Sequence, residues 1–310
     1  MKEWNGFKKG IDLGGWLSQC DYSEDRLENF IKEEDIAKIA SWGLDHVRLP
    51  VDYNVIELPN GYGYIDRAVE WCRKYGLNII IDIHKTRGFS FDKGENQTGF
   101  FDSAELQEYF YSMWENIAAK YGNDSEHIAF ELLNEVTCKE YIGEWNRIAN
   151  ECIKRIRAIA PDTVILVGSY YNNSVTTVFE LDKPYDDKVV YNFHCYDPIE
   201  FTHQGAYWTD KIDRNKRVSF EESGTSVEYF EKLFTSAIET AQKNDTILYC
   251  GEYGVIDVVS PEDTLKWYKV INQVFEAHGI GRSAWSYKQM DFGISDVRMD
   301  GVRDELLKVL

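Results

Sequence analysis

The sequence is poor in basic residues and contains no long apolar run. Lys and Arg together number 34 against 53 Asp and Glu, a formal net charge of −19. A chain this acidic is repelled by nucleic acid and by anionic membranes. We therefore expect neither as a partner and favour a neutral or small ligand. No stretch approaches the length of a membrane span, and residues 1–6 lack the apolar core of a signal peptide. We expect a cytoplasmic protein if the sequence is complete, and a secreted one if a leader has been removed.

The six cysteines have neither disulfide-scaffold nor zinc-site spacing. They form no C-x-x-C pair, and Cys72, Cys152 and Cys250 fall inside apolar segments, as free thiols usually do. The chain also lacks an H-E-x-x-H motif, a close histidine pair, and a G-x-G-x-x-G after the first expected strand. These absences argue against a disulfide framework, a zinc hydrolase and a dinucleotide-binding fold.

Apolar runs of strand length alternate with helical patterns along the whole chain. The expected strands are 7–13, 44–49 (ended by Pro50), 77–83, 128–133, 163–167, 189–193, 247–250 and 280–285. The expected helices are 33–42, 65–75, 103–121, 144–159, 227–242, 261–278 and 304–310, with a weak turn near 175–181. These units predict one α/β domain over residues 1–310, a (β/α)8 TIM barrel with a long loop at 198–225, between strand six and helix six. A doubly wound open sheet is the alternative.

Polar and aromatic residues recur at the carboxyl ends of the expected strands, where barrel enzymes carry their functional side chains. The residues at these positions are Arg48, Asp82, His84, Asn134, Glu135, His194, Tyr196, Glu252, Tyr253 and Trp285. Each alone has a structural explanation, such as an ion pair for Arg48 or a ring filling the barrel rim for Trp285. Their convergence on one rim favours a functional site.

Two carboxylates, Glu135 and Glu252, follow strands four and seven, which face each other across the barrel mouth. Glycoside hydrolysis needs such a pair: an acid of raised pKa that protonates the leaving oxygen, and an ionised partner at the anomeric carbon. Arg48, His194 and Tyr196 could keep one carboxylate ionised and orient it. The pair therefore indicates a glycosidase.

Other rim residues suit the same chemistry. Asn134 could bind the sugar hydroxyl beside the anomeric centre, and Trp285 could form a floor for the ring. Glu131 lies further from the rim, and we assign it no role in the reaction. The main alternative is a metal site with four candidate ligands: His84, His194, Glu135 and Glu252. Barrel metallohydrolases usually open with H-x-H after strand one, which this chain lacks.

Seven motifs, spread over nearly the whole chain, resemble glycoside hydrolase family 5 of the endoglucanase (cellulase) type. They are Gly10-Ile11-Asp12-Leu13-Gly14-Gly15-Trp16, His46-Val47-Arg48-Leu49-Pro50, Asp82-Ile83-His84, Leu133-Asn134-Glu135, His194-Cys195-Tyr196, Gly251-Glu252-Tyr253-Gly254 and Ala284-Trp285. The resemblance implies an endo-β-1,4-glucanase that cleaves cellulose-type or mixed-linkage β-glucans by double displacement, without metal or cofactor. Glu135 would be the acid/base and Glu252 the nucleophile, with carboxyls about 5–5.5 Å apart.

By the same resemblance, six residues would bind the substrate: Arg48, His84, Asn134, His194, Tyr196 and Trp285. A β-mannanase or exo-β-1,3-glucosidase of the same family, or a non-catalytic carbohydrate-binding barrel, remains an alternative. We expect a monomer acting on β-glucan polysaccharide or oligosaccharide. Lys85 departs from the second histidine that many relatives carry there. Tyr207 and Trp208, in the long loop, either stack on a sugar or attach the loop to the barrel.

Overall fold

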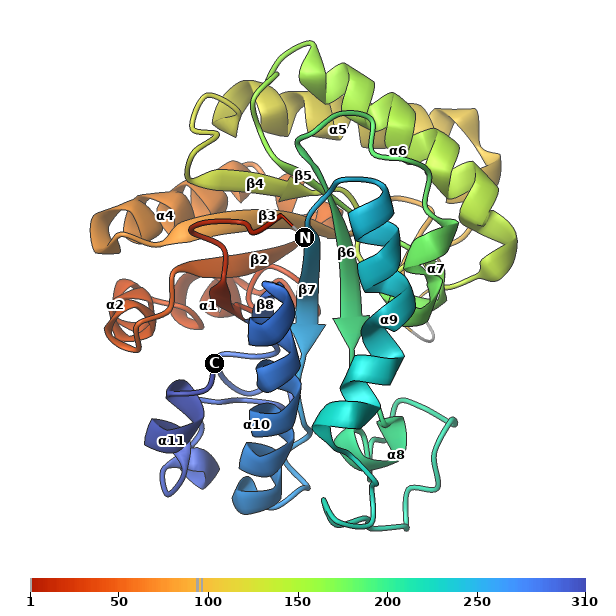
Figure 1. Cartoon of the computed structure of the whole chain (residues 1–310). Helices are drawn as coiled ribbons and strands as arrows, with labels where there is room; N and C mark the ends of the chain where they lie inside the picture. The colour runs from red at the N-terminus through yellow and green to blue at the C-terminus, as the bar shows by residue number, and fades with distance from the viewer. Residues whose placement is uncertain (1, 93–94, 96) are drawn as a thin grey trace.

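Eight parallel strands form a closed barrel in which each strand pairs with the next and β8 pairs with β1 (Figure 1). The computed structural model describes residues 2–92, 95 and 97–310. The strands are β1 (Lys9–Asp12), β2 (His46–Asp52), β3 (Asn78–Lys85), β4 (Ile128–Glu131), β5 (Ile165–Gly168), β6 (Val189–Cys195), β7 (Leu248–Tyr253) and β8 (Gly281–Ala284). Closure confirms the predicted (β/α)8 barrel and excludes the open sheet.

Helices surround the barrel and connect its strands (Figure 1). They are α1 (Glu24–Asn29), α2 (Glu33–Ser41), α3 (Tyr53–Ile56), α4 (Gly61–Tyr75), α5 (Ala104–Tyr121), α6 (Ile142–Arg157), α7 (Tyr170–Asn173), α8 (Ile199–Thr202), α9 (Val227–Lys243), α10 (Pro261–His278) and α11 (Arg303–Leu307). Short 3-10 turns are η1 (Phe100–Asp102), η2 (Lys139–Tyr141), η3 (Val175–Glu180) and η4 (Val297–Met299). The long helices α5, α9 and α10 begin at serine caps, Ser103, Ser226 and Ser260, whose hydroxyls accept backbone N–H bonds.

The apolar core has two layers. The larger lies where the helices pack on the barrel, and the smaller contains Ile80 and Ala129. Strand register puts Ile80 beside Arg48, and Ala129 beside Ile80, so these side chains share the inner face of the barrel. Trp4 and Phe7, stacked at 4.0 Å, belong to the same inner cluster. The barrel is therefore packed solid on its amino-terminal side, which leaves the carboxyl ends of the strands for the site.

Several predicted boundaries were wrong. Strand β2 continues through Pro50 to Asp52, because β1 pairs with β2 only as far as Arg48 and the missing proline N–H lies beyond that pairing. Strands β6 and β7 also run on, so His194 and Glu252 lie within strands. The predicted loop at 198–225 contains the short helix α8 but is otherwise irregular.

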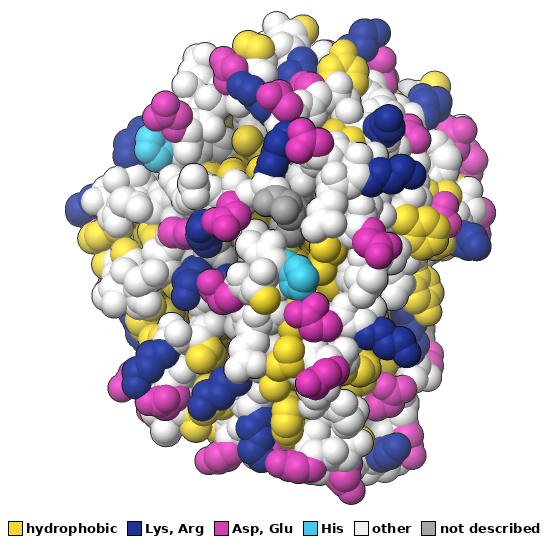
Figure 2. Space-filling model, viewed as in Figure 1, with side chains coloured by type: hydrophobic (Ala, Val, Ile, Leu, Met, Phe, Trp, Pro, Cys, Tyr) yellow, Lys and Arg dark blue, Asp and Glu magenta, His cyan; other side chains and the backbone are white. Residues whose placement is uncertain are grey.

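The surface mixes charges of both signs. Figure 2 shows acidic and basic side chains interspersed over the face in view.

All six cysteines are free thiols. In the part of the chain that the structure describes, no helix combines the length and apolarity needed to cross a membrane.

Candidate active site

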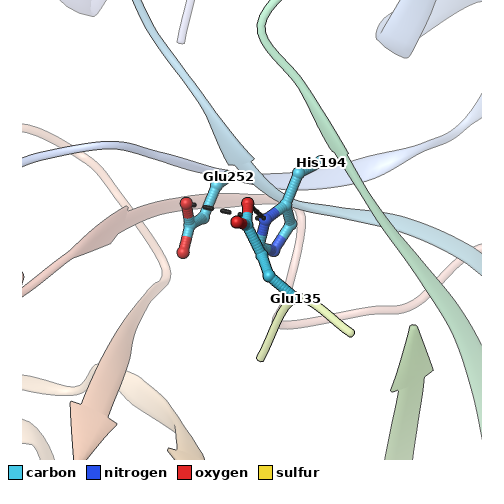
Figure 3. A group of neighbouring side chains, drawn as sticks. All are labelled: Glu135, His194 and Glu252. Atoms are coloured by element: carbon cyan, nitrogen blue, oxygen red, sulfur yellow. Dashed lines mark hydrogen bonds and ion pairs between the residues drawn. The ribbon is translucent and has the colours of Figure 1, made fainter. Parts of the chain in front are cut away.

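Three side chains converge at the barrel mouth: Glu135 from the segment after β4, His194 from β6 and Glu252 from β7 (Figure 3). One oxygen of each carboxylate and a ring nitrogen of His194 all lie within 4.8 Å of one another. Inverting glycosidases hold their carboxyls about 6.5–9.5 Å apart to admit a water, whereas retaining ones hold them about 5–5.5 Å apart. The two carboxylates thus approach closely enough for a retaining pair.

Arg48, fully buried on β2, organises the floor of this site. Its Nε and Nη2 donate to the two oxygens of Glu131 at 2.7 and 2.8 Å. Its Nη1 donates to Glu252 Oε1 at 2.7 Å, and Nη2 also donates to Asn134 Oδ1 at 2.9 Å. Planar, bidentate guanidinium contacts of this kind restrict both partners. Arg48 thus orients one oxygen of Glu252 and the amide of Asn134.

Four acidic side chains surround the single positive charge of Arg48. Asp82 and Asp12 lie 3.0 and 3.5 Å from the guanidinium, in addition to Glu131 and Glu252. Burial raises the pKa of Asp12 well above its usual value, and repulsion from the neighbouring carboxylates adds to this despite Arg48. Burial likewise raises the pKa of Glu131. These shifts weaken the competition of the deeper acids with Glu252 for the charge of Arg48.

Glu252 has the opposite shift. Burial would raise its pKa, but the positive charges of His194, Arg48 and His84 outweigh burial and lower the pKa below the ordinary value. The Tyr196 hydroxyl donates to Oε2 at 2.8 Å, so each oxygen of Glu252 has a donor. Glu252 is therefore held ionised and in a fixed orientation, as a nucleophile must be.

Glu135 occupies a different environment. Its Oε1 lies 2.8 Å from His194 Nδ1, its Oε2 accepts from Asn172 Nδ2 at 3.0 Å, and no Arg or Lys contacts it among the described residues. Its backbone has φ +36°, a conformation that bulky residues rarely adopt and that is often found at functional sites. His194 also lies 3.6 Å from Glu252. Burial would lower the pKa of His194, but these two carboxylates raise it.

His84, Asn134 and Trp285 complete the rim. His84 Nδ1 lies 2.6 Å from Asp82 Oδ2, and its ring is parallel to the indole of Trp285 at 5.9 Å. A Cβ at Gly14 would come within 2.7 Å of that indole, so only glycine admits the ring there. The amide nitrogen Nδ2 of Asn134 is buried without a hydrogen-bond partner among the described residues. A substrate hydroxyl would satisfy that donor.

The eight residues that the sequence assigned to catalysis or substrate binding thus meet at one rim. Tyr253, also expected at the rim, packs against Trp267 and Phe275 of α10 instead, so that part of the prediction was wrong. Three partners of the eight residues were not predicted: Asp12, Glu131 and Asn172. Glu131, to which the sequence assigned no role, is the bidentate partner of Arg48. Strand alternation contained a signal for it, since Glu131 and Arg48 both lie on the inner face of the barrel.

The three remaining ambiguous positions, Lys85, Tyr207 and Trp208, differ in exposure. Lys85 is buried, with Nζ 2.7 Å from Glu95 and 3.7 Å from Asp52. In the 199–225 segment, the ring of Trp208 packs against Phe292 with centroids 6.4 Å apart, whereas Tyr207 is 70% exposed. Trp208 therefore helps to attach the segment to the barrel, whereas the Tyr207 ring contacts Trp208 at its edge and leaves most of its surface in solvent.

The metal alternative finds only partial support in the geometry. Glu135, His194 and Glu252 could supply three ligand atoms, but His84 contacts Asp82 instead. Both oxygens of Glu252 already accept bonds, one of them from a guanidinium at 2.7 Å. A second cation beside Arg48 would meet electrostatic repulsion, so the donor set does not fit a metal ion well.

The model of one protein family, Cellulase (glycosyl hydrolase family 5), matches residues 9–291. The chain belongs to this family. Family 5 membership confirms the predicted resemblance and makes the chain a glycoside hydrolase with a retaining mechanism.

Curated relatives of this family 5 chain align over most of its length. Cellodextrinase A of Ruminococcus flavefaciens is 60% identical, with 91% of this chain and 86% of the relative covered. Endoglucanase C of Acetivibrio thermocellus is 37% identical, with 98% of both chains covered. Among solved structures, the cellulose synthase subunit Z of Clostridioides difficile matches with a TM-score of 0.82 and 26% identity, over 98% of this chain and 99% of that one.

Proposed function

We propose that this family 5 enzyme cleaves β-1,4-glucosidic bonds in cellulose-type or mixed-linkage β-glucans, with Glu135 as acid/base and Glu252 as nucleophile. The observation that carries the proposal is the pairing of two close carboxylates in different environments. Glu252 has Arg48 and Tyr196 on its oxygens and a lowered pKa, whereas the donors that contact Glu135, among the described residues, are the Asn172 amide and His194. The names of the relatives, cellodextrinase and endoglucanase, support a glucan substrate.

The reaction has two displacements. In the first, a Glu252 oxygen forms a bond to the anomeric carbon while the bond to the leaving oxygen breaks, and that oxygen takes the proton of Glu135. In the second, Glu135, now a carboxylate, removes a proton from water. The water oxygen bonds to the anomeric carbon, and the glycosyl–Glu252 ester bond breaks. The product keeps the original anomeric configuration because two inversions cancel.

Other rim residues position the sugar. The unpartnered Asn134 amide donates to the hydroxyl next to the anomeric carbon, a bond that strengthens in the transition state. The indole of Trp285 and the ring of His84 provide the surface beneath the sugar ring. Arg48, Tyr196 and His194 orient the carboxylates.

We further propose that residues 1–310 act as a single catalytic domain and as a monomer, on soluble glucans or oligosaccharides in preference to crystalline cellulose. The experiment must also distinguish other activities of family 5, since Glucan 1,3-beta-glucosidase of Blumeria graminis is 34% identical over 36% of this chain. A β-mannanase would use the same rim.

Product analysis on cello-oligosaccharides, lichenan, laminarin, xylan and mannan tests the assignment. We expect hydrolysis of the cello-oligosaccharides and lichenan with retained configuration by NMR, and little release from laminarin or mannan. Faster hydrolysis of mannan or laminarin would assign the chain to one of the alternatives. Binding without hydrolysis of any substrate would indicate a carbohydrate-binding barrel.

A further inference from the structure

A left-handed turn follows β5 and lies beside Glu135. Tyr171, Asn172 and Asn173 have φ values of +58°, +56° and +55°. Each such residue costs free energy relative to ordinary backbone, least for Asn, so three in succession persist only where the surroundings enforce them. Strain of this kind often coincides with a functional requirement.

Hydrogen bonds made by Asn172 and Asn173 help to hold the turn in place. Asn173 Oδ1 accepts from the Ser169 backbone N–H at 3.1 Å, which ties the turn to the end of β5. The Asn172 backbone N–H donates to the carbonyl oxygen of Val136, the residue after Glu135, at 3.0 Å. The turn is thereby fixed against the segment that carries Glu135.

The same turn delivers a side-chain amide to the Glu135 carboxylate. Asn172 Nδ2 donates to Oε2 at 3.0 Å, on the oxygen that His194 does not contact. Glu135 is 13% exposed at its side chain, so the contact lies largely out of water. Without Asn172, His194 would be the one hydrogen-bond partner left on the Glu135 carboxyl within the described part of the chain.

We propose that Asn172 is a positioning residue for the acid/base, an inference that rests on the proposed role of Glu135. Its N–H donor fixes the plane of the Glu135 carboxyl toward the leaving oxygen. The bond also strengthens as Glu135 gives up its proton, because hydrogen bonds to an ionised acceptor are stronger than bonds to a neutral one. Such a contact stabilises the transition state more than the ground state.

The substitution Asn172→Gly tests this directly, because glycine tolerates positive φ and keeps the turn while removing the amide. We expect kcat/KM on cello-oligosaccharides, which have poor leaving groups, to fall about tenfold or more. On dinitrophenyl cellobioside, which needs little proton assistance, we expect a fall of less than about threefold. Asn172→Asp keeps the size of the side chain and replaces the donor by an acceptor. It should show the same split between substrates, a large fall in kcat/KM on cello-oligosaccharides and a small one on dinitrophenyl cellobioside.

Asp245→Gly is the matched control. Asp245 has φ +51° in the turn before β7, at the amino-terminal end of the barrel, so the variant relieves similar backbone strain far from the site. This variant should leave kcat/KM unchanged on both substrates. A parallel Glu135→Ala variant separates the two proposals. If Glu135→Ala shows the split and both Asn172 variants do not, the inference about Asn172 is wrong. If Glu135→Ala lacks the split, the acid/base assignment itself fails.

Discussion

Glu135 and Glu252 are chemically identical side chains whose neighbours give them different properties. Glu252 receives a guanidinium and a phenol hydroxyl, while Glu135 receives an amide and an imidazole. The cationic neighbours lower the pKa of Glu252, so this carboxylate is ionised when substrate binds. The two roles therefore follow from contacts within a few ångströms, and each contact can be tested separately.

Arg48 should matter for stability as well as orientation. In Arg48→Met, four buried carboxylates lose their shared cation, so we expect the free energy of unfolding to fall by about 3–5 kcal/mol in urea titrations. Arg67→Met is the control, because its pair with Glu28 is partly exposed and should be worth under about 1 kcal/mol. Equal effects of the two substitutions would contradict the central place of Arg48.

His194 predicts a pH dependence of stability. Its pKa is raised above the ordinary 6.5 by Glu252 and Glu135, so the folded state binds its proton more tightly than the unfolded state. The resulting stabilisation is complete below pH 6.5 and is lost as the pH rises through the folded-state pKa. We expect the free energy of unfolding to decline as the pH rises above 6.5 and through the folded-state pKa of His194.

The variant His194→Asn isolates this contribution. Urea titrations should show a shallower decline with pH in the variant than in the unaltered protein. The His84–Asp82 pair remains and contributes to the rest, since Asp82 raises the pKa of His84 against the effect of burial. The raised pKa values of the buried acids Asp12 and Glu131 contribute in the same direction. Identical pH profiles in both proteins would show that His194 does not contribute to the pH dependence of stability.

At the scale of elements, long segments were predictable and short ones were not. The sequence predicts α10 at its observed bounds, because a serine cap, a first-turn proline and a terminal glycine mark both ends. The four-residue helices α3 and α8 were missed, since one helical turn has no periodicity to detect. Strand ends also shifted, because pairing with neighbouring strands, unseen in a local pattern, decides where a strand stops.

The candidate site also has residues that the sequence predicts and residues that it does not. Rim residues were predictable because strand order alone places them together. Glu131 and Asp12 lie deeper, where only the register of neighbouring strands reveals that they reach Arg48. Asn172 had no usable signal, since its contact depends on three consecutive positive φ values. Asparagine tolerates that conformation, but the residue type alone does not require it.

The 199–225 segment offers a test of what its aromatic residues do. Trp208→Ala should lower stability by about 1–3 kcal/mol, because the ring packs against Phe292 and His203. Tyr207→Ala should leave stability within about 0.5 kcal/mol, because the ring is exposed, and should raise KM for longer oligosaccharides only. Thermal denaturation and a KM series over chain length check both results. Destabilisation by Tyr207→Ala would assign that ring to packing instead.

At the scale of the whole molecule, the barrel places a charged site above an apolar interior. The inner cluster around Ile80 and Tyr249 fills the barrel below Arg48, and the helices cover the outside. This rigid support keeps two carboxylates close despite their mutual repulsion, which Arg48 and the two histidines offset. The fold was predictable from alternating strands and helices, because eight such units have few other ways to bury both faces of every strand.

The central claim is that Glu252 forms a covalent bond to the substrate. Incubation with dinitrophenyl 2-deoxy-2-fluorocellobioside slows the second displacement, and mass spectrometry of the intact and digested protein then locates any adduct. We predict the mass of one fluorocellobiosyl group on the peptide that contains Glu252, and no adduct in Glu252→Gln. Turnover of the reagent by active enzyme without an adduct, or an adduct at another residue, would contradict the account.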